Sequence, residues 1–112
     1  MHELGITRNI VAIVAEAAQG KRVHRVVLEV GKLGGVMPDA IAFCFDVVAQ
    51  GTAVEGAKLD IVEVAGAACC RRCEAEFEIL NLFTACACGS RDVAVTRGEE
   101  LMIKTMDVEE AA

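Results

Sequence analysis

The first eighteen residues carry apolar side chains at helical spacing. Apolar positions recur every three or four residues, the period of one face of an α-helix, and they are Ile6, Ile10, Ile13, Val14 and Ala17. Gln19 and Gly20 follow, and glycine just after the last periodic residue is typical of a helix C-cap. The pattern predicts a helix over residues 3–18 with this stripe buried.

The chain then contains three runs of strand character and a second helix. The strand-like runs are rich in β-branched residues and alternate apolar with polar positions; they cover residues 21–31, 58–65 and 100–108. Pro38 opens the second helix, because proline is tolerated in a first turn, and Gly51 ends it. The buried stripe of this helix is predicted to be Ile41, Cys44, Phe45 and Val48.

Cysteines cluster between the last two of these strands. Five of the six cysteines lie within twenty residues, and the sixth, Cys44, is interpreted as a small buried hydrophobic residue. The sequence therefore predicts an α+β fold with a small mixed sheet and two helices. We expect that domain to comprise residues 1–66 and 96–112, with an inserted cysteine module at residues 67–95.

The spacing of the clustered cysteines favours a metal site. Cys70 and Cys73 form a Cys-x-x-Cys pair, and Cys86 and Cys88 follow as Cys-x-Cys thirteen residues later. Four thiolates form the closed tetrahedral set that structural Zn²⁺ prefers. A redox pair or buried free thiols are the alternatives, but a redox pair usually opens a helix, whereas strand-like alternation follows Cys73. Cys69, which is adjacent to Cys70, could take the place of one of these four ligands.

Composition restricts the class of protein and its partners. The 112 residues carry 11 basic and 17 acidic side chains, a net charge of −6, which disfavours nucleic acid as a partner. No apolar run is long enough to span a membrane, and the first residues do not resemble a signal peptide. Clustered cysteines without a secretion signal suit a reducing compartment. We therefore expect a cytoplasmic protein with no membrane partner.

The chain start has its own candidate chemistry. In Met1-His2-Glu3, the α-amine, the amide nitrogen of His2 and its imidazole could close two fused chelate rings around one ion. A deprotonated amide and a square-planar field suit Ni²⁺ or Cu²⁺ rather than zinc. A disordered terminal histidine is the alternative. The other histidine, His24, is expected to face solvent from a strand.

Several motifs together resemble the HypA/HybF family of hydrogenase nickel-insertion proteins. They span nearly the whole chain and read MHELGIT, LEVGKLGGVMPDAIAFCFDVVAQGT, the Cys-x-x-Cys pair, CGS and GEELMIKTMDVE. The resemblance implies a non-enzymatic nickel metallochaperone with an inserted structural zinc module. It implies nickel binding through the Met1 amine, His2 and Glu3, with Asp39 as a further candidate near that site.

The zinc ligands of the family are two Cys-x-x-Cys pairs, and this chain departs from that pattern. Cys70, Cys73 and Cys88 match, whereas Ala85 stands where the third cysteine is expected. We take Cys86 as the third ligand, because a local backbone shift can keep Cys-x-Cys on one ion. Cys69 is the alternative.

The resemblance also implies partners. They are the large subunit of a nickel-iron hydrogenase and a GTPase that helps to insert nickel, and a homodimer is one of the oligomeric states that the sequence leaves open. Two other classes compete. One is a zinc-ribbon module that binds protein or nucleic acid through Arg71, Arg72, Arg91 and Arg97, and the other is a thiol oxidoreductase.

Overall fold

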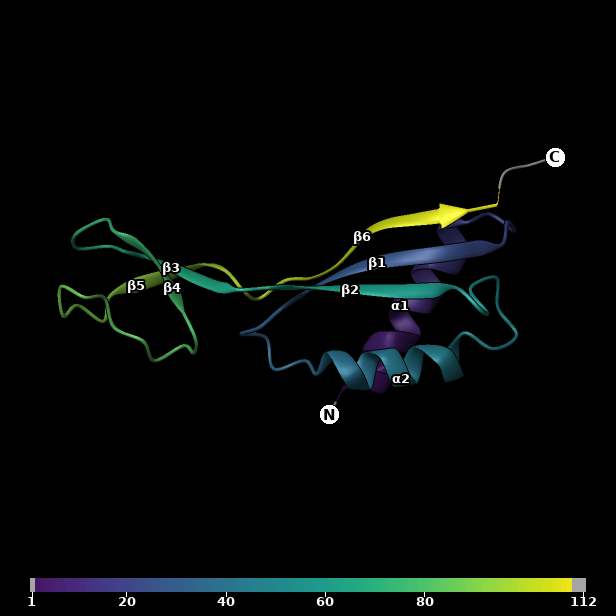
Figure 1. Cartoon of the computed structure of the whole chain (residues 1–112), viewed down its shortest axis with the longest axis horizontal. Coiled ribbons are helices and arrows are strands. Elements are labelled where there is room, and N and C mark those ends of the chain that lie inside the picture. Colours follow the sequence, from purple (N-terminus) through teal and green to yellow (C-terminus); the bar gives the residue numbers. More distant parts are fainter. Residues whose placement is uncertain (1, 110–112) are drawn as a thin grey trace. The chain divides into compact units, whose positions relative to one another are not determined.

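The computed structural model describes residues 2–109, which form two helices and six strands (Figure 1). The helices are α1 (Glu3–Ala17) and α2 (Pro38–Val48); the strands are β1 (Val23–Gly31), β2 (Lys58–Val64), β3 (Gly66–Cys70), β4 (Glu76–Ile79), β5 (Val93–Arg97) and β6 (Leu101–Val108). The predicted helices and the three long strands are confirmed within a few residues. No helix among residues 2–109 has the length and apolar character needed to cross a membrane.

The strands form two separate three-stranded sheets. One has the order β2-β1-β6 and the other the order β4-β3-β5. The chain accordingly divides into two compact units. Among the described residues, the first unit comprises 2–28, 36–62 and 102–109, and the second comprises 29–35 and 63–101. The expected domain boundaries at residues 66, 67, 95 and 96 stay a prediction.

In the first unit, α1 buries a face that differs from the predicted stripe. Its buried residues are Glu3, Thr7, Ile10, Val11 and Val14. Ile13, by contrast, is 57% exposed, and Ala17 is also exposed, so the assignment of these two residues to the buried stripe was wrong. The buried face runs along positions 3, 7, 10 and 14, which have the same helical period but include two polar side chains. Apolar residues lie on both sides of that line, so hydrophobicity alone did not fix the rotation of the helix.

Helix α2 and strand β1 supply the rest of this core. The helix packs against α1 and buries Ile41 and Phe45, as predicted, while Cys44 is half-buried. Strand β1 alternates as expected, with Val26 and Leu28 completely buried. Proline at the first turn of α2 and Asp39 beside it suit the helix start, where a free N–H is not required and the dipole favours negative charge.

The second unit is held by very close backbone packing. Strand β3 pairs antiparallel with both β4 and β5. A side chain at Gly66 would lie 2.7 Å from both the Ile79 carbonyl oxygen and the Leu33 side chain, and one at Gly98 would lie 2.8 Å from Leu33. Gly98 also has a φ of +109°, which other residues rarely adopt. Glycine at these two positions therefore lets Leu33 pack directly on the backbone at the start of β3 and just after β5.

We expect Phe45→Ala to lower the free energy of unfolding by about 3–5 kcal/mol, because the ring is 2% exposed and its loss leaves a cavity. Phe43→Ala is the matched control, since Phe43 lies on the same helix but is 74% exposed. That change should cost less than about 0.5 kcal/mol. Urea denaturation followed by circular dichroism at 222 nm measures both, and equal losses would contradict the assigned core.

Candidate metal centre

Four cysteines from three parts of the second unit meet at one point. Cys70 is the last residue of β3, Cys73 lies in the turn that follows, and Cys86 and Cys88 lie in the loop before β5. All four Sγ atoms lie within 4.8 Å of one another. Cys70 and Cys86 are buried, whereas Cys73 and Cys88 are exposed. The set could hold one ion with access from solvent on one side.

The sulfur separations fit tetrahedral coordination. The Sγ atoms of Cys70 and Cys88 are 3.8 Å apart, and those of Cys73 and Cys86 are 3.5 Å apart. A Zn–S bond of about 2.3 Å requires sulfurs about 3.8 Å apart at the corners of a tetrahedron. A disulfide needs an S–S distance of about 2.05 Å, and all six cysteines are free thiols. The geometry thus suits a four-thiolate metal site better than a redox disulfide.

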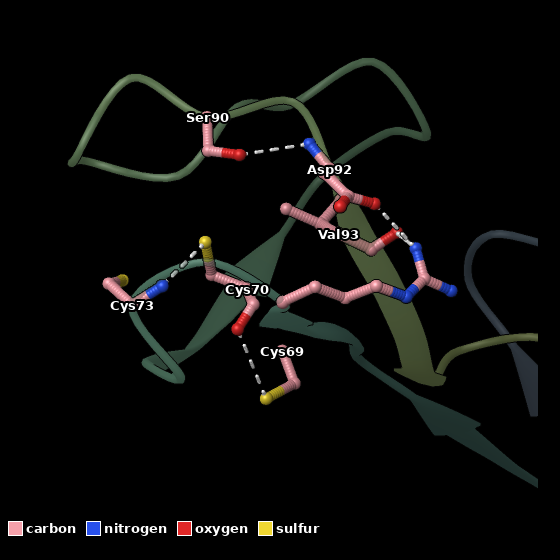
Figure 2. Close-up of polar contacts among 7 residues, drawn as sticks. Cys69, Cys70, Cys73, Ser90, Asp92 and Val93 are labelled. Carbon is pink, nitrogen blue, oxygen red and sulfur yellow. Dashed lines mark hydrogen bonds and ion pairs between the residues drawn. The ribbon is translucent and has the colours of Figure 1, made fainter.

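Backbone N–H groups around the first pair favour a thiolate. The backbone N–H of Cys73 donates to the Sγ of Cys70, with the nitrogen and the sulfur 3.5 Å apart. Figure 2 shows this bond. This bond is the main cause that lowers the pKa of the Cys70 thiol to about 6, and the N–H of Arg72 adds to it against the opposing effect of burial. Cys70 is therefore prepared to be the first anionic ligand.

Cys86 behaves in the opposite way. The backbone N–H of Cys88 lowers its pKa, but burial and the neighbouring thiols of Cys73, Cys88 and Cys70 outweigh this bond and raise the pKa of Cys86 to about 12. The backbone of the loop nevertheless fixes its position, because the Cys86 N–H donates to the Ser90 carbonyl oxygen at 2.9 Å. An ion that binds here must displace the proton from Cys86, which makes metal affinity depend on pH.

Cys69 stays outside this set. Its sulfur lies 3.8 Å from the carbonyl oxygens of Cys70 and Glu74. Neighbouring residues on a strand point to opposite faces of the sheet, and the sulfurs of Cys69 and Cys70 point in different directions in Figure 2. The structure thus brings Cys86, and not Cys69, to the other three thiols.

Ion pairs tie the turn after β3 to the start of β5. The Arg71 guanidinium donates to the Asp92 carboxylate at 2.9 Å and to the Val93 carbonyl oxygen at 3.3 Å. Arg97 forms a longer pair, at 3.4 Å, with Glu76. Two of the four arginines of the suggested basic patch are therefore neutralised by acidic neighbours, which weakens the case for nucleic-acid binding.

The candidate nickel residues lie at the starts of the two helices in the first unit. His2 is exposed and precedes α1, and Asp39 is exposed in the first turn of α2. Glu3 is only 8% exposed, and its carboxylate accepts the Met37 N–H at 3.4 Å. The Met1 amine lies outside the described residues.

Sequence reasoning missed this contact of Glu3 with the start of α2. A signal did exist, because Glu3 continues the line of positions 7, 10 and 14 that the helix buries. Thr7 supports the same turn, since its hydroxyl donates to the Glu3 carbonyl oxygen at 2.6 Å. A carboxylate on a buried helical face indicates a specific polar partner.

Comparisons with known proteins agree with these features. A family model described as hydrogenase/urease nickel incorporation, metallochaperone, HypA matches residues 1–108. Hydrogenase maturation factor HypA of Trichormus variabilis is 57% identical over 110 residues, which are 98% of this chain and 97% of that protein. The factor of the same name from Geobacter sulfurreducens is 46% identical over 110 residues, 97% of this chain and all of that protein.

The fold also resembles solved structures. The solution structure of the Ni metallochaperone HypA from Helicobacter pylori superposes with a TM-score of 0.69 at 23% identity, over 96% of this chain and 97% of that one. A second solution structure of HypA protein gives a TM-score of 0.71 at 24% identity, over 97% of both chains. These likenesses confirm the predicted α+β fold class.

Ligand substitution should separate Cys86 from Cys69. With Co²⁺ as an optical probe, the wild-type chain should bind one ion with the absorption of a four-thiolate site. Cys86→Ser should weaken binding on the order of tenfold or more and change the thiolate-to-metal band, because one sulfur is lost. Cys69→Ser, the adjacent control, should leave both unchanged. The reverse pattern would contradict the ligand set.

Proposed function

Since this chain belongs to the HypA family of hydrogenase/urease nickel-incorporation metallochaperones, we propose that it binds Ni²⁺ at its N-terminus and passes it on during maturation of a nickel-iron hydrogenase. A metallochaperone hands its ion to another protein and is not an enzyme, as expected from the sequence. The observation that carries the proposal is the match to the family over residues 1–108, together with His2 at the exposed start of α1.

Nitrogen donors at the chain start suit nickel. The α-amine of Met1, the amide nitrogen of His2 and its imidazole offer two fused chelate rings, and a deprotonated amide favours square-planar Ni²⁺. An amide that precedes the helix is not committed to the helical hydrogen-bond ladder, so its nitrogen can become a ligand at low cost. His2 accordingly combines a side-chain donor and a backbone donor at one exposed residue.

Two acidic residues support this site in different ways. The Glu3 side chain is buried against the Met37 N–H, so it anchors the start of α1 to the start of α2. We therefore assign Glu3 a contribution through its backbone and through positioning. Asp39 is exposed in the first turn of α2 and keeps its carboxylate available as a further oxygen donor.

Release of nickel follows from the same donors. Amide and imidazole nitrogens bind protons as well as metal, so acidification or a partner that competes for them frees the ion. Exposure of His2 gives an accepting protein direct access. The ion is cargo, and a site that protonates readily is suited to surrender it.

We further propose a structural Zn²⁺ held by Cys70, Cys73, Cys86 and Cys88. The support is the set of four sulfurs within 4.8 Å, with pair separations close to those of a tetrahedron. When bound, zinc would cross-link the end of β3 to the loop before β5. This contribution is to folding rather than to transfer.

The partners proposed for this role are the hydrogenase large subunit and a GTPase that drives nickel insertion. We place these steps in the cytoplasm. Transfer from one N-terminus requires no second copy, and a homodimer is equally compatible with the role.

Native mass spectrometry of the untagged protein tests the nickel site. We expect wild-type protein to bind one Ni²⁺ in addition to zinc. His2→Ala should lose nickel and keep zinc, and so should a chain extended by one residue before Met1, because the extension removes the chelating amine.

His24→Ala is the matched control, since His24 is the other histidine of the chain and lies exposed on β1. It should bind nickel as wild type does. Equal nickel binding by wild type, the extended chain and His2→Ala would refute the N-terminal site and leave the zinc module as the functional element.

A further inference from the structure

The loop after β4 displays large apolar side chains to solvent. Leu80 is 87% exposed, Leu82 is 56% exposed and Phe83 is 84% exposed. Isolated exposed apolar residues are ordinary, but three within four positions form a contiguous patch, and such patches mark interaction sites. None of these residues belongs to the proposed metal sites.

A network of hydrogen bonds holds this loop in shape. The Asn81 side-chain oxygen accepts the Phe83 N–H at 2.8 Å, and the Thr84 hydroxyl donates to the Asn81 carbonyl oxygen at 3.2 Å. An asparagine that bonds the backbone two residues ahead stabilises a turn. The turn therefore holds Phe83 in its exposed position. Because the loop is already ordered, binding of a partner would cost little further conformational entropy.

The patch borders a hollow in the same unit. The hollow has a volume of about 320 Å³, near the lower end of ligand pockets, and is lined by Lys32, Leu33, Gly35, Leu80, Asn81, Leu82 and Phe83. One residue of its lining, Leu33, is fixed in position, because its side chain packs on the backbone at Gly66 and Gly98. A hollow of this size accommodates one bulky apolar side chain.

The charge of the residues that line the hollow indicates which kind of ligand it would bind. Lys32 is the only charged residue that lines the hollow, and its side chain forms no ion pair with any other residue between 2 and 109. The rest of the lining is apolar apart from Asn81, whose side-chain oxygen already serves the turn. A carboxylate next to an apolar side chain complements this combination, and complementary charge increases both specificity and association rate.

We propose that the surface formed by Lys32, Leu33 and residues 80–83 docks a segment of a partner protein that places a bulky apolar side chain beside a carboxylate. The apolar side chain enters the hollow and the carboxylate pairs with Lys32. This recognition is independent of the nickel donors, so either proposal can fail without the other.

Fluorescence anisotropy tests the proposal with two labelled peptides and the full-length protein. In the acidic probe, leucine and phenylalanine alternate with aspartate; in the basic probe, lysine replaces every aspartate. The wild-type chain should bind the acidic probe more tightly. Lys32→Glu should weaken that binding on the order of tenfold and should favour the basic probe, because attraction becomes repulsion.

Matched controls separate the surface from general charge and hydrophobicity. Lys21→Glu makes the same change in net charge on an exposed residue of the first unit, and it should leave binding unchanged. Phe83→Ala should weaken binding about tenfold. Phe43→Ala removes a ring of similar exposure, 74% against 84% for Phe83, from α2 and should have no effect.

Three outcomes would overturn the proposal. The first is equal binding of both probes, and the second is no binding of the acidic probe at millimolar concentration. The third is co-sedimentation with phosphatidylglycerol vesicles that is lost in Phe83→Ala while the acidic probe does not bind, which would assign the patch to a lipid surface. The net charge of −6 disfavours that third result.

Discussion

The second unit depends on the convergence of four cysteine sulfurs, because it has few bulky side chains to bury. Apart from Val30 and Ile79, its fully buried apolar residues within the described range are alanines and cysteines. Strands of four and five residues with such a core gain little from the hydrophobic effect. A bound ion would therefore add stability that the small core supplies only in part. The close backbone approach at Gly66 and Gly98 also partly compensates for the small side chains.

The first unit is stabilised in the ordinary way, and this frees its surface for chemistry. Phe45 and Leu28 provide a core of large side chains between the helices and the sheet. One polar contact in this core, from Glu3 to the Met37 N–H, fixes how α1 begins relative to α2. The residue that precedes it, His2, needs no role in packing and stays exposed. The start of α1 thus presents His2, a donor of the proposed nickel site, to solvent, and this exposure suits binding followed by release.

Hydrophobic periodicity was sufficient to predict both helices and the three long strands, because each has a clear repeat and a glycine or proline at one end. It failed for the rotation of α1, where Ile13 is as apolar as the buried positions and where Glu3 is buried through a contact distant in sequence. Strands β3 and β5 were not predicted. In β3, the small residues Gly66–Cys70 carry no alternation of apolar and polar positions. The choice of Cys86 over Cys69 rested on the argument that a local backbone shift can keep Cys-x-Cys on one ion, since the family pattern places the third cysteine at Ala85. In the structure, opposite strand faces separate Cys69 from the other thiols.

The two proposed donor sets, nitrogen at the N-terminus and sulfur in the second unit, would also let one chain distinguish nickel from zinc. Intrinsic affinities of nitrogen and sulfur ligands for nickel and zinc overlap, so a protein that holds both ions must separate them by geometry. Four sulfurs near the corners of a tetrahedron suit zinc and disfavour square-planar nickel, whereas amine, amide and imidazole nitrogens do the reverse. In the proposed scheme, the buried Cys70 and Cys86 thiols would slow the exchange of zinc, and the exposed His2 would permit the exchange of nickel. Retention of zinc and transfer of nickel, as proposed, would then require no conformational switch, because both would follow from ligand type and burial.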